Sequence, residues 1–319
     1  MKNSLAITAG LCALAGLLMA TEEVISCCRF ALRLCSELIL PSLFPFFVLT
    51  GLLGRLGLPG LLGKWLGPLA GRIFRCSGAG ATAFFLGLTG GYPMGAAFIA
   101  DMERTGAVSP EEASRLLAFC NNSGPAFIVG AVGAGAFGSA GAGLFLYIIH
   151  ILAAALTGFL LRPRHAPAAP GQAVLPRPMA VTAALAESVK QAVAAVLTVC
   201  GFVVCFTVLV GLLDARGLFS LLSGRLSELL GLPLSFSRAM LTGLLELGSG
   251  VGALRGLALC PINLALAAGI LGWGGISVQF QTLALFSDSE IKTAPHAAGR
   301  LISGILGFLL AFFLGSLVF

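Results

Sequence analysis

Long apolar runs without charged residues alternate with short polar segments along the chain. A helix needs about 20 apolar residues to cross the hydrocarbon core of a bilayer. The pattern therefore predicts an all-α, polytopic membrane protein with about eight to ten membrane segments, including broken or re-entrant helices. The charge-free runs are Asn3–Thr21, Leu38–Gly54, Cys76–Ala100, Leu116–Leu161 (long enough for two passes), Gln191–Leu213, Gly256–Ser287 and Leu301–Phe319.

The segments between these runs have other expected roles. Asn3–Thr21 lacks a small-residue cleavage site of the signal-peptide type, and we interpret it as the first membrane helix. Arg55–Arg75 and Leu218–Leu230 mix basic residues, leucine and glycine, as interfacial helices do. Asp101–Arg115 is rich in charge and is expected outside the bilayer. Ser109 is its predicted helix N-cap, followed by proline and two acids.

Composition supports the membrane interpretation. Hydrophobic residues make up 58% of the chain and charged residues 10%, whereas soluble domains carry about 25% charged residues. The net charge of +6 comes from Lys and Arg at the ends of apolar runs. This placement fits cytoplasmic, positive-inside loops and argues against nucleic acid as a partner. The bilayer is the expected partner, and the oligomeric state is left open.

A proline- and arginine-rich linker separates two halves that resemble each other. We predict a first membrane half at residues 1–161, a linker at 162–180 and a second half at 181–319. Phe46–Leu58 aligns with Phe206–Leu218, and Gly87–Ala96 aligns with Gly243–Ala253 after one insertion. Related halves with interrupted apolar segments at matching positions indicate a transporter. The alternative is the low-complexity similarity of membrane helices.

Two interruptions in the first half are candidate binding segments. Glycine and proline free backbone groups from the helix, and such a break survives in lipid only when it faces protein or a water-filled cavity. A new half-helix at Ala126–Val129 would direct its amides at an anion. The alternatives are a packing kink and an interfacial cap formed by the two asparagines. The candidate residues are Gly90, Gly91, Tyr92, Pro93, Asn121, Asn122, Ser123 and Gly124.

The second half has its own polar candidates. Glu246, with Ser249 close by, stands in an apolar stretch, where an acid indicates a functional site. It is expected to bind a proton, a cation or a substrate donor, or to pair with Arg255; an exposed interfacial carboxylate is the alternative. Gln279 is a further candidate in a glycine-rich break, and Gln281 would point to the same side if this stretch were extended.

Signs of enzymatic chemistry are weak. His150, His165 and His296 are isolated, and His150 is predicted to lie at the membrane interface. The sequence contains no HExxH motif, no GxSxG elbow and no ATPase motif, and its cysteines form no CxxC pair. We therefore expect neither an enzyme nor a protein with a metal site or a cofactor.

Several motifs together resemble one family. The chain is similar to the YlbJ (SpoVV) family of sporulation integral membrane proteins, within the wider nucleoside-recognition or Gate-domain group, over nearly its whole length. Spore maturation proteins A and B of that group are the competing assignment. The motifs that carry the resemblance are Pro41–Phe47, Gly90–Gly95 (GGYPMG), Glu111–Leu117, Asn121–Pro125 (NNSGP) and Gly272–Ser277.

The resemblance implies a transporter with one Gate-like repeat in each half. Its substrate would be a small anion, dipicolinic acid, alone or together with calcium. Transport would run from the mother cell toward the forespore across the outer forespore membrane. The alternatives are a nucleoside-type carrier and a membrane scaffold that transports nothing; a membrane-embedded hydrolase would need a catalytic dyad that the sequence lacks.

Overall fold

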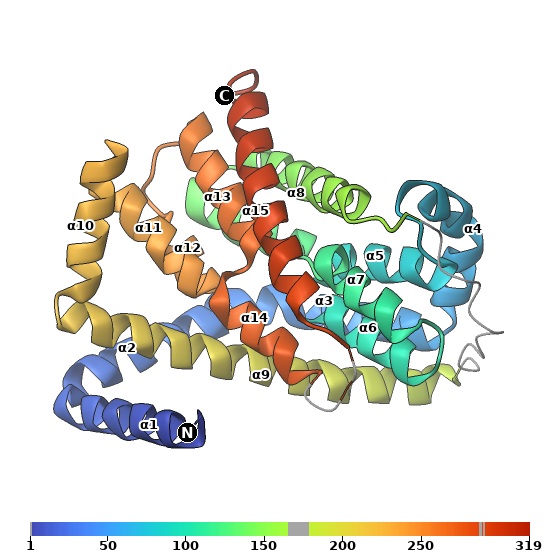
Figure 1. Cartoon of the computed structure of the whole chain (residues 1–319), viewed down its shortest axis with the longest axis horizontal. Coiled ribbons are helices and arrows are strands. Elements are labelled where there is room, and N and C mark those ends of the chain that lie inside the picture. The colour runs from blue at the N-terminus through green and yellow to red at the C-terminus, as the bar shows by residue number, and fades with distance from the viewer. Residues whose placement is uncertain (1, 165–178, 287–288, 290) are drawn as a thin grey trace.

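The computed structural model describes residues 2–164, 179–286, 289 and 291–319, and these residues form helices and no strand (Figure 1). His165 and most of the predicted linker lie outside this range. Before the linker the elements are α1 (Lys2–Met19), α2 (Thr21–Leu34), η1 (Cys35–Ile39), α3 (Leu40–Arg55), α4 (Leu58–Ile73), α5 (Gly78–Gly90), α6 (Met94–Arg104), α7 (Pro110–Cys120), η2 (Ala126–Ala136) and α8 (Ala140–Leu160). After it they are α9 (Val181–Ala215), α10 (Leu218–Leu230), α11 (Leu234–Leu245), α12 (Leu247–Ala253), α13 (Pro261–Trp273), α14 (Gly275–Ala284) and α15 (Ala294–Gly315).

The all-helical membrane architecture predicted from the apolar runs is confirmed. Five stretches among the described residues are long and apolar enough to cross a membrane: 21–55, 140–160, 181–215, 261–284 and 294–315. Shorter apolar helices lie at Gly10–Met19, Gly78–Gly90, Ala126–Ala136 and Leu234–Leu245. The chain is therefore an integral, multi-pass membrane protein that combines full spans with half-length apolar helices.

The helices on the two sides of the linker follow a similar order. The continuous rod formed by α2, η1 and α3 has 35 residues, as does α9. Each rod is followed by a left-handed glycine, Gly57 (φ 94°) or Gly217 (φ 70°), and then by a shorter helix, α4 or α10. Glycine adopts this conformation without a Cβ clash and therefore ends each rod. The two glycines match in the predicted alignment; the division into halves itself stays a prediction.

Short breaks divide the apolar segments where the sequence predicts them. The first break lies between α5 and α6, where Gly91 has a φ of 83°. The second, 121–125, separates α7 from η2, which is wound as a π-helix. In the second half, extended backbone at Glu246 separates α11 from α12. Ser109 caps α7 as predicted, because its Oγ accepts a 3.2 Å hydrogen bond from the amide of Glu112.

Glycine contacts bring the breaks together. A Cβ at Gly87 or Gly95 would overlap the carbonyl oxygen of Cys120, so α5 and α6 approach the end of α7 closely. A Cβ at Gly91 would lie 2.9 Å from the amide nitrogen of Gly124. The first break is therefore packed directly on the second, at a separation that a larger residue would prevent.

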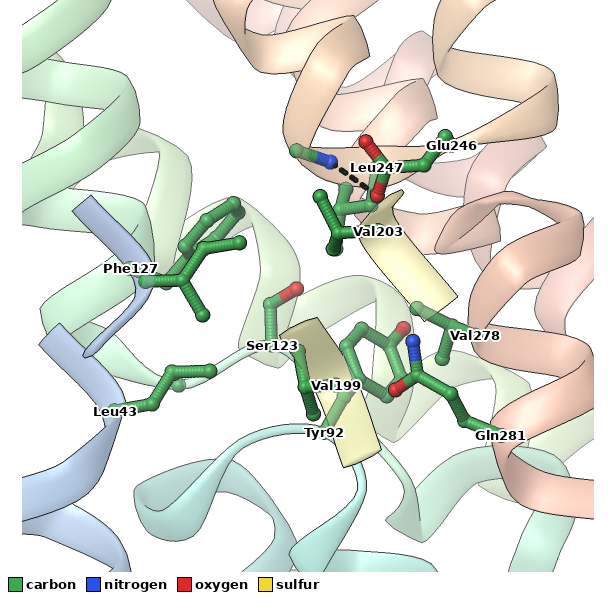
Figure 2. Close-up of a pocket in the computed structure, with 13 residues that line it drawn as sticks. Leu43, Tyr92, Ser123, Phe127, Val199, Val203, Glu246, Leu247, Val278 and Gln281 are labelled. Carbon is green, nitrogen blue, oxygen red and sulfur yellow. Dashed lines mark hydrogen bonds between the residues drawn. The ribbon is translucent and has the colours of Figure 1, made fainter. Parts of the chain in front are cut away.

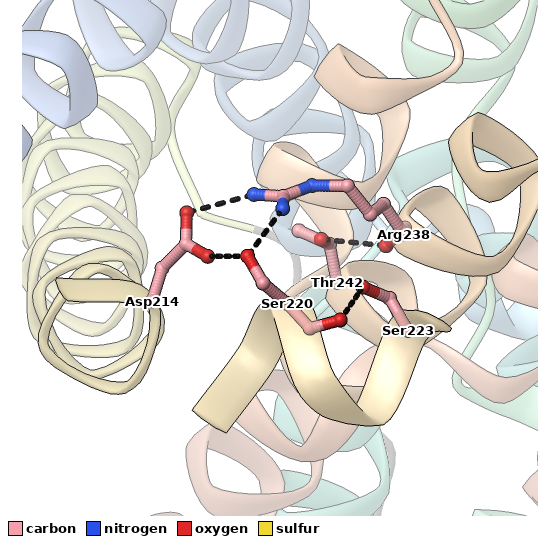
Figure 3. Close-up of polar contacts among 5 residues, drawn as sticks. All are labelled: Asp214, Ser220, Ser223, Arg238 and Thr242. Carbon is pink, nitrogen blue, oxygen red and sulfur yellow. Dashed lines mark hydrogen bonds and ion pairs between the residues drawn. The ribbon is translucent and has the colours of Figure 1, made fainter. Parts of the chain in front are cut away.

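A polar cluster holds α10 at its place beside α9 and α11 (Figure 3). The guanidinium of Arg238 donates to Asp214 Oδ2 at 2.7 Å and to Ser220 Oγ at 3.0 Å. Ser220 Oγ in turn donates to Asp214 Oδ1 at 2.9 Å.

Helices α4 and α10, which follow the two rods, lie at opposite ends of the molecule's long axis (Figure 1).

Candidate functional site

The centre of the molecule contains a fully buried arginine on α15. Arg300 is 0% exposed. Its Nη1 donates to Tyr92 Oη (2.7 Å), to the carbonyl oxygen of Asn121 (2.6 Å) and to Asn122 Oδ1 (3.2 Å). Its Nη2 donates to Ser303 Oγ at 2.9 Å. The side chain thus joins both breaks of the first half to the last helix of the second.

Close packing of α15 on α7 positions this arginine. A Cβ at Gly299 would overlap the backbone of Ala118, so the two helices touch backbone to backbone one residue before Arg300. Ser303, one turn further along α15, also bonds Thr157 Oγ1 on α8 at 2.8 Å. The packing of Gly299 on Ala118 and the hydrogen bond to Ser303 therefore orient the guanidinium toward residues 121–122.

The two asparagines fix the end of α7. Asn122 Nδ2 donates to the carbonyl of Phe119 at 2.8 Å, which caps the last turn. Asn121 reaches across, since its Nδ2 donates to Thr282 Oγ1 on α14 at 2.9 Å and its Oδ1 accepts from the amide of Ala96 at 3.2 Å. Both side chains are 0% exposed. The break thus lies in the protein interior, and Asn122 caps the helix as the alternative expected; the depth of the break in the membrane stays a prediction.

All hydrogen-bond partners of Arg300 are neutral. Among the described residues, no carboxylate lies within ion-pair distance of the guanidinium, and its Nε has no hydrogen-bond partner. A buried charge without a counter-ion is costly in a low-dielectric interior. The guanidinium therefore lacks a counter-ion, and its Nε–H can still donate a hydrogen bond to a ligand.

Beside this network lies a small cavity lined by residues from both sides of the linker (Figure 2). Its volume is about 40 Å³, enough for a few water molecules, since one water needs roughly 10–15 Å³. Tyr92, the partner of Arg300, forms part of its wall. Two wall residues carry buried oxygens without a partner among the described residues, Ser123 Oγ and Gln281 Oε1. Other wall residues are Phe127 of η2, Val199 and Val203 of α9, and Glu246.

Glu246 is 1% exposed and caps the start of α12. Its carboxylate accepts from the amide of Gly248 at 2.9 Å and from the amide of Ser249, and Ser277 Oγ lies 3.5 Å from Oε1. The exposed-carboxylate alternative is excluded. Among the described residues no cation pairs with Glu246, so one wall of the cavity carries a carboxylate and the opposite network a guanidinium.

Comparison with known proteins assigns the chain to a family. It is 32% identical over 294 residues to the sporulation integral membrane protein YlbJ of Bacillus subtilis (strain 168), covering 84% of this chain and 72% of that protein. The chain belongs to the YlbJ family. In addition, the family described as Gate, nucleoside recognition, matches residues 38–140, which include both breaks of the first half.

Two solved structures share the fold of this YlbJ-family chain. A double variant of CNTnw in an outward-facing state superposes with a TM-score of 0.55 at 16% identity, covering 99% of this chain and 84% of that one. A single variant of CNTnw in its intermediate 3 state gives 0.53 at 15% identity, covering 98% and 85%. At this level of identity the likeness shows a shared fold alone, so the chain has the fold of CNTnw and belongs to a family of membrane proteins.

The structure brings together only some of the residues that the YlbJ-family sequence suggested. Tyr92, Ser123, Gly124 and Glu246 line the cavity. Gly91, Asn121 and Asn122 adjoin these residues in the chain but do not line the cavity, whereas Ser249 bonds Thr207 of α9 at 2.9 Å. Gly90 is buried against Met94 and Thr50, and Pro93 precedes α6.

Other sequence expectations are corrected. Arg255 is exposed and does not pair with Glu246, which is satisfied by the backbone of its own helix. The stretch around Gln279 is helical, so residues two apart diverge. Gln279 donates to the carbonyl of Trp273 at 3.1 Å, while Gln281 lines the cavity. His150 is 3% exposed rather than interfacial, and its Nε2 accepts from the amide of Ser123 at 3.1 Å.

Sequence reasoning missed Arg300, which served only to mark the edge of an apolar run. One signal was present in this YlbJ-family chain. Arg300 lies between Ala297-Ala298-Gly299 and Ser303-Gly304, and such small residues let neighbouring helices approach. A charged residue within a small-residue face of a membrane helix indicates a buried functional position.

Proposed function

We propose that the protein is a carrier for a small organic anion, and that this anion is dipicolinic acid moved from the mother cell toward the forespore. The carrying observation is the buried guanidinium of Arg300, whose partners are all neutral. Guanidinium groups bind carboxylates in a two-pronged geometry. An anion that approaches through Tyr92 would supply the missing counter-charge.

The cavity supports the same proposal. Ser123 Oγ and the start of η2 provide donors next to Tyr92, and carboxylate oxygens are suitable acceptors for them. Gln281, which lies beside Tyr92 in Figure 2, can turn its amide toward the ligand. Glu246 on the far wall would repel a carboxylate, so we expect the anion to bind on the Ser123–Tyr92 side.

The present cavity is too small for an organic dianion, because small-molecule sites measure about 300–1,000 Å³. Its walls come from both sides of the linker, with η2 and the Tyr92 break on one side and α9, α12 and α14 on the other. Binding therefore requires these groups of helices to separate. Such a movement between two groups of helices is how a carrier exposes one site alternately to each side.

A nucleoside-type carrier is the second candidate, because the Gate match and the CNTnw fold both favour it. A neutral nucleoside would leave Arg300 without a counter-charge, and this observation favours the anion. Competition separates the two: uridine in excess should leave dipicolinate binding unchanged. Displacement of dipicolinate by uridine at comparable concentration would favour the nucleoside carrier instead.

Removal of one hydroxyl offers a sharp test of the site. Ser123 Oγ has no partner in the described residues, so Ser123→Ala should fold normally yet bind dipicolinate about three- to ten-fold more weakly, the loss expected for one hydrogen bond. Ser237→Ala is the matched control: Ser237 Oγ is also buried and unpartnered, but it lies on α11 away from the cavity. Calorimetric titration of the purified proteins measures both affinities.

Two results would contradict the proposal. Dipicolinate that fails to bind the folded, monodisperse wild-type protein, with and without calcium, would favour the scaffold that transports nothing or another solute. Binding that is equally strong in Ser123→Ala and Ser237→Ala would move the site away from this cavity. Imaging a fluorescent fusion during sporulation tests the proposed location in the outer forespore membrane.

A further inference from the structure

A second and much larger cavity lies apart from the site described above. It is a cleft of about 750 Å³ bounded by α3, α4, the start of α5 and α6, with one residue each from α9 and the end of α14. This volume falls within the range of about 300–1,000 Å³ that is typical of small-molecule sites. The cleft can therefore accept a whole organic anion without rearrangement, which the inner cavity cannot.

The cleft carries an excess of positive charge. Its lining includes Arg55, Lys64 and Arg104 and a single acid, Asp101. Arg104 and Asp101 form an exposed pair at 3.4 Å and neutralise each other. Arg55 and Lys64 have no carboxylate within ion-pair distance among the described residues, so the cleft keeps two uncompensated cations.

Arg55 is held in a fixed position by neutral partners. Its Nη1 donates to the carbonyl of Gly51 at 3.2 Å and to Ser188 Oγ at 3.3 Å, and its Nη2 donates to Gln191 Oε1 at 3.0 Å. Two of these partners lie on α9, so the half-buried guanidinium is braced between α3 and α9. A pre-positioned cation in a cleft loses little conformational entropy when it binds an anion.

The cleft adjoins the first break. Met94, the first residue of α6, lines the cleft, and two residues earlier Tyr92 lines the inner cavity and accepts from Arg300. Met94 is 2% exposed and belongs to the same buried cluster as Tyr92. The segment 92–94 therefore stands between a large basic cleft and the small inner site.

We propose that this basic cleft is an entrance site, where Arg55 and Lys64 bind the carboxylates of the transported anion before it passes the 92–94 segment. The proposal rests on the proposed function and adds a second, outer binding step to it. The same charges would suit the phosphate of an anionic lipid headgroup. Chemical modification of Lys64 in lipid-free detergent separates these two sources of an anionic group.

The rate at which Lys64 is chemically modified can show whether the cleft is occupied. In lipid-free detergent and calcium-free buffer, an amine-reactive acetylating reagent modifies exposed lysines, and mass spectrometry gives the rate at each site. Dipicolinate should slow modification of Lys64 in a saturable manner. Lys190 and Lys292 are exposed but do not line the cleft, so their rates should stay unchanged and serve as internal controls.

Charge variants then test the binding residues. Arg55→Gln should raise the dipicolinate concentration that gives half-protection of Lys64 by about ten-fold, the loss expected for one charged hydrogen bond. Arg72→Gln removes the same charge from an exposed position on α4 outside the cleft and should leave that concentration unchanged. Equal half-protection concentrations in these two variants would overturn the proposal.

The outcomes separate this proposal from the proposed function. Ser123→Ala should keep full protection of Lys64, because the altered residue lies in the inner cavity. If dipicolinate protects Lys64 but calorimetry finds equal affinity in Ser123→Ala and Ser237→Ala, the result would support the cleft site and not the inner site. No protection of Lys64 by dipicolinate in the wild-type protein would overturn the entrance site. Protection by phosphatidylglycerol in mixed micelles, with none by dipicolinate, would overturn it in favour of a lipid headgroup.

Discussion

Arg300→Gln should reduce the affinity for dipicolinate by at least about a hundred-fold, since two or more charged hydrogen bonds of about 1.5–3 kcal/mol each are at stake. The substitution removes the buried positive charge that would balance the anion. It also releases Tyr92 Oη, which Arg300 holds at 2.7 Å on the wall of the cavity. Calorimetric titration of the purified variant measures the loss.

The effect of this substitution on stability should be much smaller. The variant loses hydrogen bonds to Asn122 and Ser303, but it also removes the cost of keeping an unpaired charge in the interior. We expect the free energy of unfolding to fall by about 1–3 kcal/mol. Thermal unfolding in detergent measures this change.

A charge-matched control separates a local effect from a general one. Arg225→Gln removes an equal charge at a side chain that is 75% exposed on α10, and it should bind dipicolinate like the wild type. Arg300→Lys keeps the charge but loses the forked geometry, so its affinity should be intermediate. If Arg300→Gln instead binds like Arg225→Gln, the guanidinium is a structural element and the anion proposal fails.

Gly299→Ala should lower the free energy of unfolding by about 3 kcal/mol, at the upper end of the range for an overpacked core. The added methyl would overlap the backbone of Ala118 and push α15 away from α7. Because Arg300 follows directly, the same displacement should pull the guanidinium off the carbonyl of Asn121 and weaken dipicolinate binding as well.

The matched control is another helical glycine. Gly201 lies on α9, and a Cβ there would meet nothing within 4 Å. Gly201→Ala should therefore leave stability unchanged or raise it by up to about 1 kcal/mol through better helix propensity. Thermal unfolding in one detergent compares the two variants. Equal stability of both would show that the contact between α15 and α7 is looser than the structure indicates.

The sequence predicted the parts of this fold that depend on local chemistry. Apolar runs specify membrane helices, and glycine and proline specify where they break, so the interruptions at Gly91 and 121–125 were predictable. The cap at Ser109 and the matching glycines 57 and 217 follow from the same local rules. None of these features requires knowledge of which helices touch.

The candidate site depends on long-range packing and was predictable only in part. Arg300 meets residues some 180–210 positions earlier, and no local pattern encodes that contact. Gln281 faces the cavity rather than Gln279 because α14 is a helix whose rotation is set by its neighbours. His150 is a second example. The sequence of an apolar helix does not show whether a histidine faces lipid or, as here, accepts a hydrogen bond from the amide of Ser123.

The length of α9 ties the cavity to the thickness of the bilayer. The charge-free part of α9, Gln191–Leu213, measures roughly 33 Å at 1.5 Å per residue. To keep this stretch in a hydrocarbon layer of about 30 Å, α9 has to lie tilted by roughly 25°. A thinner membrane would tilt the helix further. Since Val199 and Val203 of α9 form part of the cavity wall, hydrophobic mismatch would act directly on the space available to the solute.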